Sequence, residues 1–330
     1  MALTLVEAAK FSNDVLQKGV IETIVSDTPI LKKLGFIDIK GNGLTYNREG
    51  YMGGAAFHLV NGVWTESTPE LRAQVTVTTK ILGGDADVDN YLKTTRSDIQ
   101  DLEAETITEK AKAVRDTFMD RFYYGNATTS PEEFDGLHIL IPGAVAASGT
   151  IPAMVTRRVV NYVGTSGYGL GMNKVKEAIR ICKDGKPDAI LMSKLMLDLI
   201  TRYRESIANM QYDLDEFQKK VMFIDGIPVW VDDYIADVET HTSAGAFSAK
   251  TSGTNTSIFL AKFGPKYIQG VQSLPITVKK VATDLETKDA TRTRIKWYPG
   301  LMLQKVIGVS VITGIDTAYT VAATPGNTAA

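Results

Sequence analysis

The sequence predicts an α+β fold in which a compact α/β unit is inserted between a long helix and the strands that pack with it. Three observations predict this arrangement. A long helix begins near Ser97, helix and strand patterns alternate over residues 160–270, and strand patterns return over residues 275–315. The 330 residues, 44% hydrophobic and 22% charged, exclude a collagen, a coiled coil and a largely disordered chain.

Charge and cysteine content narrow the class of protein further. With 36 basic and 38 acidic residues the net charge is -2, so the overall basic excess of a dedicated nucleic-acid binder is absent. The single cysteine, Cys182, lies on the apolar face of a predicted helix, which favours a buried small side chain over a nucleophile. No apolar run reaches the roughly 18–20 residues that span a membrane, and Met1–Glu7 lacks the features of a secretory signal. We therefore expect an intracellular origin and no membrane partner.

The first 41 residues begin with a helix signal. Thr4 and Glu7 fit a capping box, and apolar residues including Leu16 and Ile24 recur on one helical face until Thr28-Pro29. Two interpretations follow. The helix packs on its own domain, or it is an arm that packs on a neighbouring subunit.

Residues 42–82 have the pattern of two strands separated by a long irregular stretch. This stretch is rich in Gly, Ser, Thr and Asn, yet it carries Tyr51, Phe57 and Trp64. Some 25 residues with little regular structure are uncommon inside a compact domain. Large apolar side chains there lack a local core, so we expect a partner surface to cover them. A flexible lid over a substrate is the alternative.

The long helix is predicted over residues 97–125. Ser97 and Gln100 form a capping box, apolar residues recur every three or four positions, and Gly125-Asn126 ends the pattern. At 1.5 Å per residue the helix is about 40 Å long. That length suits a strut better than an enzyme core.

The inserted unit contains clear turn and cap signals. Ser193 opens one of its helices, Asp225-Gly226 predicts a tight hairpin turn, and the polar segment 240–256 has the composition of an exposed loop. Beyond it, residues 306–312 are apolar enough for a buried strand, and the tail from Ala318 is expected to be loosely ordered.

A search for catalytic chemistry finds no complete set of residues. His58, His138 and His241 lie far apart in sequence, which favours structural roles. The Gly164–Gly171 loop precedes a helix but lacks a Walker ending, so a flexible hairpin is favoured over a phosphate site. The clusters at Asp85–Asp89 and Asp213–Glu216 favour solvated turns, since the first forms only half of a calcium loop.

Charges are unevenly distributed along the chain. Nine basic and three acidic residues lie between Lys262 and Lys305, whereas residues 97–126 carry seven acidic and four basic residues. Opposite charges on two parts of a chain can set the register between identical subunits. A solvated basic face is the other interpretation.

The order of these parts resembles the major capsid protein family of tailed bacteriophages, with the Hong Kong 97-type fold that encapsulins share. The resemblance covers nearly the whole chain and rests on the stretches quoted above, together with Phe134–Ile141, Ile224–Tyr234, Ser257–Tyr267 and Thr291–Ile315. It implies the following organisation: N-terminal arm 1–41; extended loop 42–82; peripheral domain 83–158 and 272–317, with its spine helix at about 97–125; axial domain 159–271; C-terminal tail 318–330.

The resemblance implies a structural role without catalysis, cofactor or metal. Such subunits form hexamers and pentamers of an icosahedral shell around double-stranded DNA, without sequence-specific DNA binding. The implied setting is a virion assembled in the host cytoplasm with a portal and a separate scaffolding protein. An encapsulin-like nanocompartment shell is the alternative, and a phosphate-binding α/β enzyme is a remote one. The candidate contacts between subunits are Tyr51, Phe57, Trp64, Leu16 and Ile24.

One feature departs from part of this family. Some members cross-link covalently through a lysine of the extended loop and a neighbour's asparagine, but here no lysine lies between Gly41 and Thr79. We therefore expect no cross-link at the tip of this loop.

Overall fold

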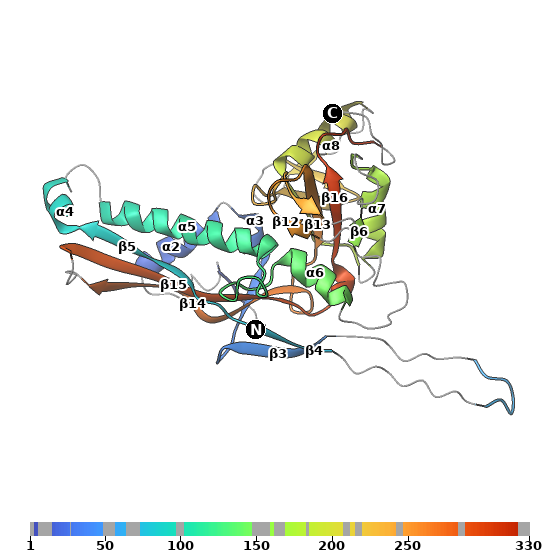
Figure 1. Cartoon of the computed structure of the whole chain (residues 1–330), viewed down its shortest axis with the longest axis horizontal. Coiled ribbons are helices and arrows are strands. Elements are labelled where there is room, and N and C mark those ends of the chain that lie inside the picture. Colours follow the sequence, from blue (N-terminus) through green and yellow to red (C-terminus); the bar gives the residue numbers. More distant parts are fainter. Residues whose placement is uncertain are drawn as a thin grey trace.

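The computed structural model places two packed bodies and a projecting ribbon in one chain (Figure 1). The residues that the structure describes are 3–5, 15–26, 28–48, 57–63, 73–96, 102–146, 159–161, 169–182, 185–206, 212–214, 220–241, 247–282 and 288–322.

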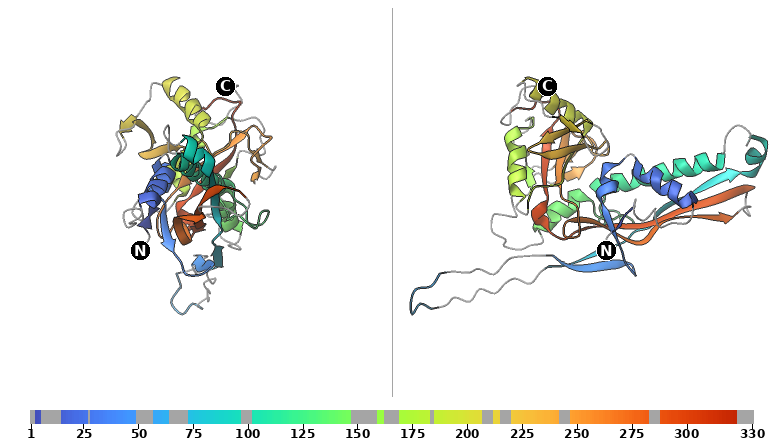
Figure 2. Two further views of the ribbon diagram at one scale, coloured as in Figure 1. Left: turned by 90° about the vertical axis from the view of Figure 1, so that its left-hand side faces the viewer. Right: turned by 180° about the vertical axis from the view of Figure 1, so that it is seen from behind.

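The first body is an elongated five-stranded sheet covered by helices. Its strands, in spatial order, are β1 (Leu3–Thr4), β2 (Gly35–Asp38), β14 (Ile268–Ala282), β15 (Ala290–Leu303) and β5 (Leu82–Asp89). The helices of this part of the chain are α2 (Val15–Ser26), α3 (Pro29–Lys33), α4 (Asn90–Arg96) and α5 (Leu102–Tyr124). Helix α5 runs along the sheet, and α2 packs beside it (Figures 1 and 2).

An aromatic core joins α5 to this sheet. Phe118 of α5 lies 4.5 Å from Trp297 of β15 and 6.3 Å from Phe36 of β2, measured between ring centroids. All three side chains are almost completely buried. The predicted apolar face of the long helix is therefore the face that holds α5 on the sheet.

The second body is a seven-stranded sheet with helices on its faces. Its strands, in order, are β6 (Val159–Asn161), β16 (Ser310–Asp316), β13 (Asn255–Ala261), β7 (Ala189–Met192), β10 (Ile227–Val231), β9 (Lys220–Ile224) and β8 (Tyr212–Leu214). Helices α7 (Met172–Ile181) and α8 (Lys194–Ser206) pack around it (Figure 1). As predicted, Ser193 caps α8 through Met196 N–H, and Asp225 and Gly226 turn the β9–β10 hairpin with positive φ.

Smaller elements complete the fold. They are the ribbon of β3 (Gly43–Arg48) and β4 (Ala73–Thr78), the pair β11 (Thr240–His241) and β12 (Phe247–Ala249), helix α6 (Leu137–Ala146) and the 3-10 turn η1 (Val306–Gly308). None of the helices in the described part of the chain combines the length and the apolar character that crossing a membrane requires.

The structure corrects three expectations. Residues 310–316, assigned to the peripheral domain, form β16 inside the seven-stranded sheet, because a strand that is apolar at successive positions is stable where both of its faces are covered. The segment 240–256 is not simply an exposed loop, since it contains β11 and β12. Asp85, Asp87 and Asp89 lie on strand β5 and not in a turn.

The N-terminal segment packs on its own chain. Val20, Ile21 and Ile24 of α2 belong to the same buried core as α5, so the first interpretation holds for the described part of this segment. Thr4 lies in β1 and pairs with Gly35. Glu7 lies outside the described residues, so the capping box stays a prediction.

Candidate assembly surface

The turn over residues 57–63 carries apolar side chains that this chain leaves exposed. Phe57 is 109% exposed relative to its reference state, and Leu59, Val60 and Val63 are between 87% and 93% exposed. Gly62 N–H donates to Leu59 O at 2.9 Å, which closes the turn. Figure 1 shows the turn far from both bodies, beyond the end of the β3–β4 ribbon. The sequence from Gly50 to Thr65 holds no Asp, Glu, Lys or Arg. Several large apolar side chains exposed on one short turn are typical of a contact with another molecule.

The other predicted contact residues lie in different environments. Leu16 is 43% exposed, so it remains accessible on the surface of α2. Ile24 is 0% exposed within this chain's own core, and this corrects its choice as an inter-subunit contact. Helical periodicity identified the apolar face of α2 but could not tell which chain covers it. Tyr51 and Trp64 lie outside the described residues.

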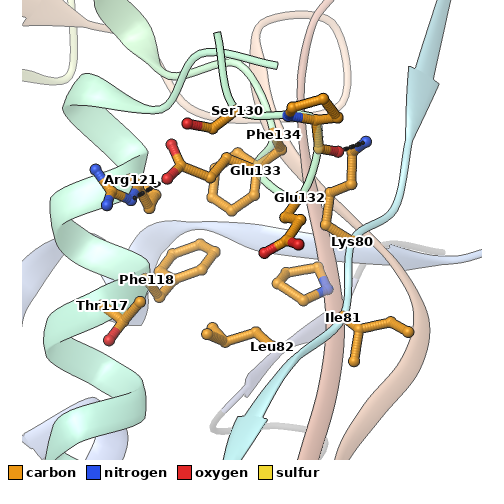
Figure 3. A pocket seen from close by; sticks show the side chains of 12 residues that line it. Lys80, Ile81, Leu82, Thr117, Phe118, Arg121, Ser130, Glu132, Glu133 and Phe134 are labelled. Atoms are coloured by element: carbon orange, nitrogen blue, oxygen red, sulfur yellow. Dashed lines mark hydrogen bonds and ion pairs between the residues drawn. The ribbon is translucent and has the colours of Figure 1, made fainter. Parts of the chain in front are cut away.

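A hollow of about 430 Å³ lies near the start of β5, next to the base of the ribbon (Figure 3). Its lining is apolar on the sides formed by Phe118, Leu82 and Phe134. Four charged residues line it: two of them, Arg121 and Glu133, pair with each other, and the carboxylate of Glu132 points into the hollow. Arg121 Nε lies 3.0 Å from Glu133 Oε1, and Lys80 Nζ donates to the carbonyl of Pro131 at 2.5 Å. An apolar group that packs on Phe118, Leu82 and Phe134 would leave this ion pair intact, provided that the side chain of Glu132 turns toward solvent.

A buried carboxylate, that of Glu239, lies where the two bodies of the chain meet. The side chain of Glu239, just before β11, is completely buried and has four side-chain neighbours within hydrogen-bond distance. Tyr124 Oη and Ser257 Oγ each donate to it at 2.5 Å. His138 Nε2 lies 3.2 Å from one oxygen, and His241 Nε2 lies 2.9 Å from the other. Residues from α5, α6, β11 and β13 thus meet at one carboxylate.

The polar contacts continue along one face of α5. Asp116, Asp120, Tyr123 and Tyr124 are spaced so that they share a helical face. They contact Tyr234, Lys250, Asp232 and Glu239 respectively, all within one stretch of the second body. We call these four contacts the α5 joint. The opposite face of the same helix holds Phe118 and the core of the first body.

The pKa values of the two buried carboxylates of the α5 joint, Glu239 and Asp232, are shifted in opposite directions. Burial raises the pKa of Glu239, but hydrogen bonds from His138 and His241, the charge of His138 and the hydroxyl of Ser257 outweigh it and lower the pKa to about 2. Burial dominates at Asp232 and raises its pKa, although Tyr123 and a backbone N–H partly oppose this. Burial and Glu239 also raise the pKa of Tyr124, which therefore stays a donor.

Sequence reasoning assigned structural roles to the histidines but missed their common partner. Glu239 and His241 are two residues apart, a spacing that places side chains on one face of an extended segment. That signal was available, whereas nothing in the sequence brings His138 to the same place. Among the described residues, no group of three or more His, Cys, Asp or Glu side chains is arranged to hold a metal ion.

The remaining sequence candidates have structural explanations. Asp85 and Asp87 form paired hydrogen bonds with Arg294 and Arg292 across β5 and β15, at 2.5–2.7 Å. Lys280 pairs with Glu103 at 3.1 Å. One ion pair therefore joins the basic region 262–305 to the acidic region 97–126 within one chain, and neither interpretation of the charge pattern had foreseen this.

The glycine-rich loop is described only from residue 169 onward. A side chain at Gly169 would meet the carbonyl of Thr320 at 2.2 Å, and Gly171 bridges to Ala322. Glycine is needed here for a close approach of two backbones, which is a structural reason for its presence. Cys182 is buried, as predicted. The cluster at 213–216 is described only in part, and its outcome stays open.

Solved structures resemble almost the whole chain. The holo-SrpI encapsulin complex from Synechococcus elongatus PCC 7942 is 13% identical with a TM-score of 0.60, covering 89% of this chain and 90% of that chain. The capsid of a native GTA particle is 10% identical with a TM-score of 0.57, covering 86% and 89%. A chain from Mycobacterium phage Bobi is 14% identical with a TM-score of 0.52, covering 88% and 89%. No family model matches the sequence, and a search of curated proteins also finds no match.

These likenesses define the class of fold. The chain has the α+β Hong Kong 97-type fold, as the sequence predicts, and the structures that share it include an encapsulin, a capsid and a phage protein. At 10–14% identity the likeness extends to the fold and leaves the function to be argued from the surface of this chain.

Proposed function

We propose that this protein is the major capsid protein of a tailed double-stranded DNA bacteriophage. Its subunits assemble as hexamers and pentamers into an icosahedral shell that encloses the genome, in a virion assembled in the host cytoplasm. The observation that carries the proposal is the exposed, uncharged turn 57–63 on a chain with a shell-forming fold. Such a turn is stabilised when a sister molecule removes it from water.

The hollow near β5 is a suitable acceptor for this turn. The apolar turn and this hollow lie at separate places on the subunit, which is the arrangement of a head-to-tail contact. Contacts of this kind close into rings when the rotation between subunits allows it. In this proposal Phe57 enters the hollow of the next subunit, with Tyr51 and Trp64 beside it and Leu16 at a further contact.

Engineered disulfides test this contact in a chain whose one cysteine is buried. In assembled protein, Phe57→Cys with Ile81→Cys at the edge of the hollow should give disulfide-linked multimers on non-reducing gels. Matched controls are Phe57→Cys alone and Phe57→Cys with Leu195→Cys, which lies exposed on α8. Shells without a link specific to the first pair would reject the contact and leave shell formation intact.

Electron microscopy of the purified chain tests the shell itself. Closed particles tens of nanometres across are the expected result. A small oligomer whose melting depends on nucleotide would instead favour the remote alternative, an α/β enzyme. Reducing gels of the purified shells should show no ladder, since the loop has no lysine between Gly41 and Thr79.

A second candidate is an encapsulin-like nanocompartment shell, favoured by the likeness to the SrpI encapsulin complex. The extended loop favours the phage capsid, whereas chain length does not separate the two, since the match covers 89% of this chain and 90% of the encapsulin chain. Expression of this chain alone separates the two. Abundant, uniform shells would favour the nanocompartment, whereas irregular products would favour a capsid that needs a scaffolding partner and a portal.

A further inference from the structure

The two bodies of the chain share an apolar core, in which Tyr123 of α5 packs on Phe259 of β13, and a line of polar contacts runs along the same face of α5. Helix α5 contributes to the core of the first body through Phe118, and it faces the second body through Asp116, Asp120, Tyr123 and Tyr124. The partners lie between residues 232 and 250 of the second body. Polar contacts of this kind depend on protonation state, whereas apolar packing does not.

The buried end of the joint has a specific charge arrangement. Two imidazoles share the single carboxylate of Glu239, and the ring of His138 stacks on both Phe247 and Tyr124, with centroids 4.3 Å and 5.1 Å apart. With a proton added to one imidazole, that ring forms an ion pair with Glu239. A proton added to the second imidazole as well leaves one positive charge without a negative partner. In addition, His241 Nδ1 is buried without a hydrogen-bond partner among the described residues, so a proton there would lack an acceptor.

We propose that the α5 joint is an acid-sensitive connection that adds to the apolar contact between the two bodies while Glu239 is ionised and loosens when protons are added to the Glu239 cluster. This inference does not depend on shell assembly, because every group in it belongs to one chain.

The titratable groups around the joint come from several elements. They are Asp116, Asp120, Tyr123 and Tyr124 of α5, His138 of α6, Asp232, Asp233 and Tyr234 after β10, Glu239, His241 of β11 and Lys250 after β12. Strand β13 contributes the uncharged hydroxyl of Ser257.

The sign of the effect follows from the two buried carboxylates. The pKa of Glu239 is lowered from 4.5 to about 2, so its contribution is present above pH 4.5 and is lost as the pH falls toward 2. The pKa of Asp232 is raised, so protonation of this group favours the closed joint and works in the opposite direction. In a comparison between the wild type and a variant changed only at Glu239, the contribution of Asp232 cancels, because Asp232 titrates in both proteins.

Hydrogen–deuterium exchange of the full chain tests the proposal. Protection of peptides that cover the end of α5 and residues 232–241 is measured at pH 7 and pH 3.5 and corrected for intrinsic exchange rates. Peptides from β7 in the same samples serve as the internal reference. We expect the loss of protection at the joint on acidification to be about tenfold larger in the wild type than in Glu239→Gln.

Two further variants control this experiment. Tyr124→Phe removes one donor but keeps the carboxylate, so the acid response should persist. Asp198→Asn, which changes an exposed carboxylate on α8, should behave as the wild type. Equal acid responses at the joint and at β7 in the wild type would overturn the proposal, even if Glu239→Gln failed to fold. An undiminished response in folded Glu239→Gln would also overturn it.

Discussion

Folded proteins usually bury apolar side chains and expose charged ones, and the turn 57–63 and the α5 joint both depart from this rule. The turn exposes Phe57, Leu59, Val60 and Val63 on a segment without charge. The joint buries Glu239 and four polar neighbours between two bodies of the same chain. Local sequence indicates the exposed turn but not the buried joint. The carboxylate of Glu239 has its partners within one chain, whereas nothing in the described part of the chain covers the turn. The comparison separates the interactions that stabilise the subunit from those available for assembly.

The largest expected effect is at the joint. Glu239→Ala would leave two hydroxyls and two imidazoles without their shared acceptor, so we expect the free energy of unfolding to fall by about 3–5 kcal/mol. Urea unfolding of the dissociated subunit measures this. Asp198→Ala, which removes an exposed ion-pair partner from α8, should cost less than about 1 kcal/mol. Similar losses for both variants would remove the distinction between the joint and the ordinary surface.

The turn should show the opposite behaviour. Replacing Phe57 and Trp64 together by Ala should leave the unfolding free energy of the isolated subunit within about 0.5 kcal/mol of the wild type. It should raise the protein concentration needed for assembly at least tenfold, which corresponds to about 1.4 kcal/mol or more. Light scattering across a concentration series measures this.

Leu195→Ala is the matched control for the turn, since Leu195 is an exposed apolar residue on another surface. It should leave assembly unchanged. If shells of the Phe57 and Trp64 double variant resist denaturant as the wild type does, the turn is not the anchor of the contact.

Sequence periodicity predicted much of the fold because each signal was local. The apolar repeat of α5, the cap at Ser193 and the turn at Asp225 each depend on neighbours within a few residues. Strand β5 was missed because alternating aspartates resemble a solvated turn until Arg292 and Arg294, more than 200 positions away, are placed opposite them.

Part of the candidate site was predictable for the same reason. Phe57 could be chosen because its segment has no local core, and the structure leaves it exposed. Ile24 could not be excluded, because an apolar helix face looks the same whether its own chain or another covers it. The Glu239 cluster depends on contacts across about 100 positions, which a single sequence does not reveal.

A smaller effect distinguishes the two tyrosines at the end of α5. The hydroxyl of Tyr124 donates to Glu239 and accepts from the N–H of Ala236, whereas the hydroxyl of Tyr123 donates to Asp232. We expect both variants to lose about 1–3 kcal/mol, with the larger loss for Tyr124→Phe, which breaks two hydrogen bonds. Thermal or urea unfolding of Tyr124→Phe and Tyr123→Phe, compared side by side, decides this order. The reverse order would mean that the number of broken hydrogen bonds does not control the loss of stability.

The smallest effect is expected at the ion pairs between β5 and β15. Arg292 donates two hydrogen bonds to Asp87, at 2.6 Å and 2.7 Å. These hydrogen bonds hold the pKa of Asp87 well below its ordinary value. Because these groups are partly exposed, water and salt screen them, so Arg292→Gln should destabilise the subunit less than any variant of the joint. Melting curves in low and high salt should converge for the variant and the wild type as screening removes the pair. A loss of stability in Arg292→Gln that is independent of salt would show that Arg292 acts by packing and not by charge. The contrast between buried and exposed polar contacts would then need another explanation.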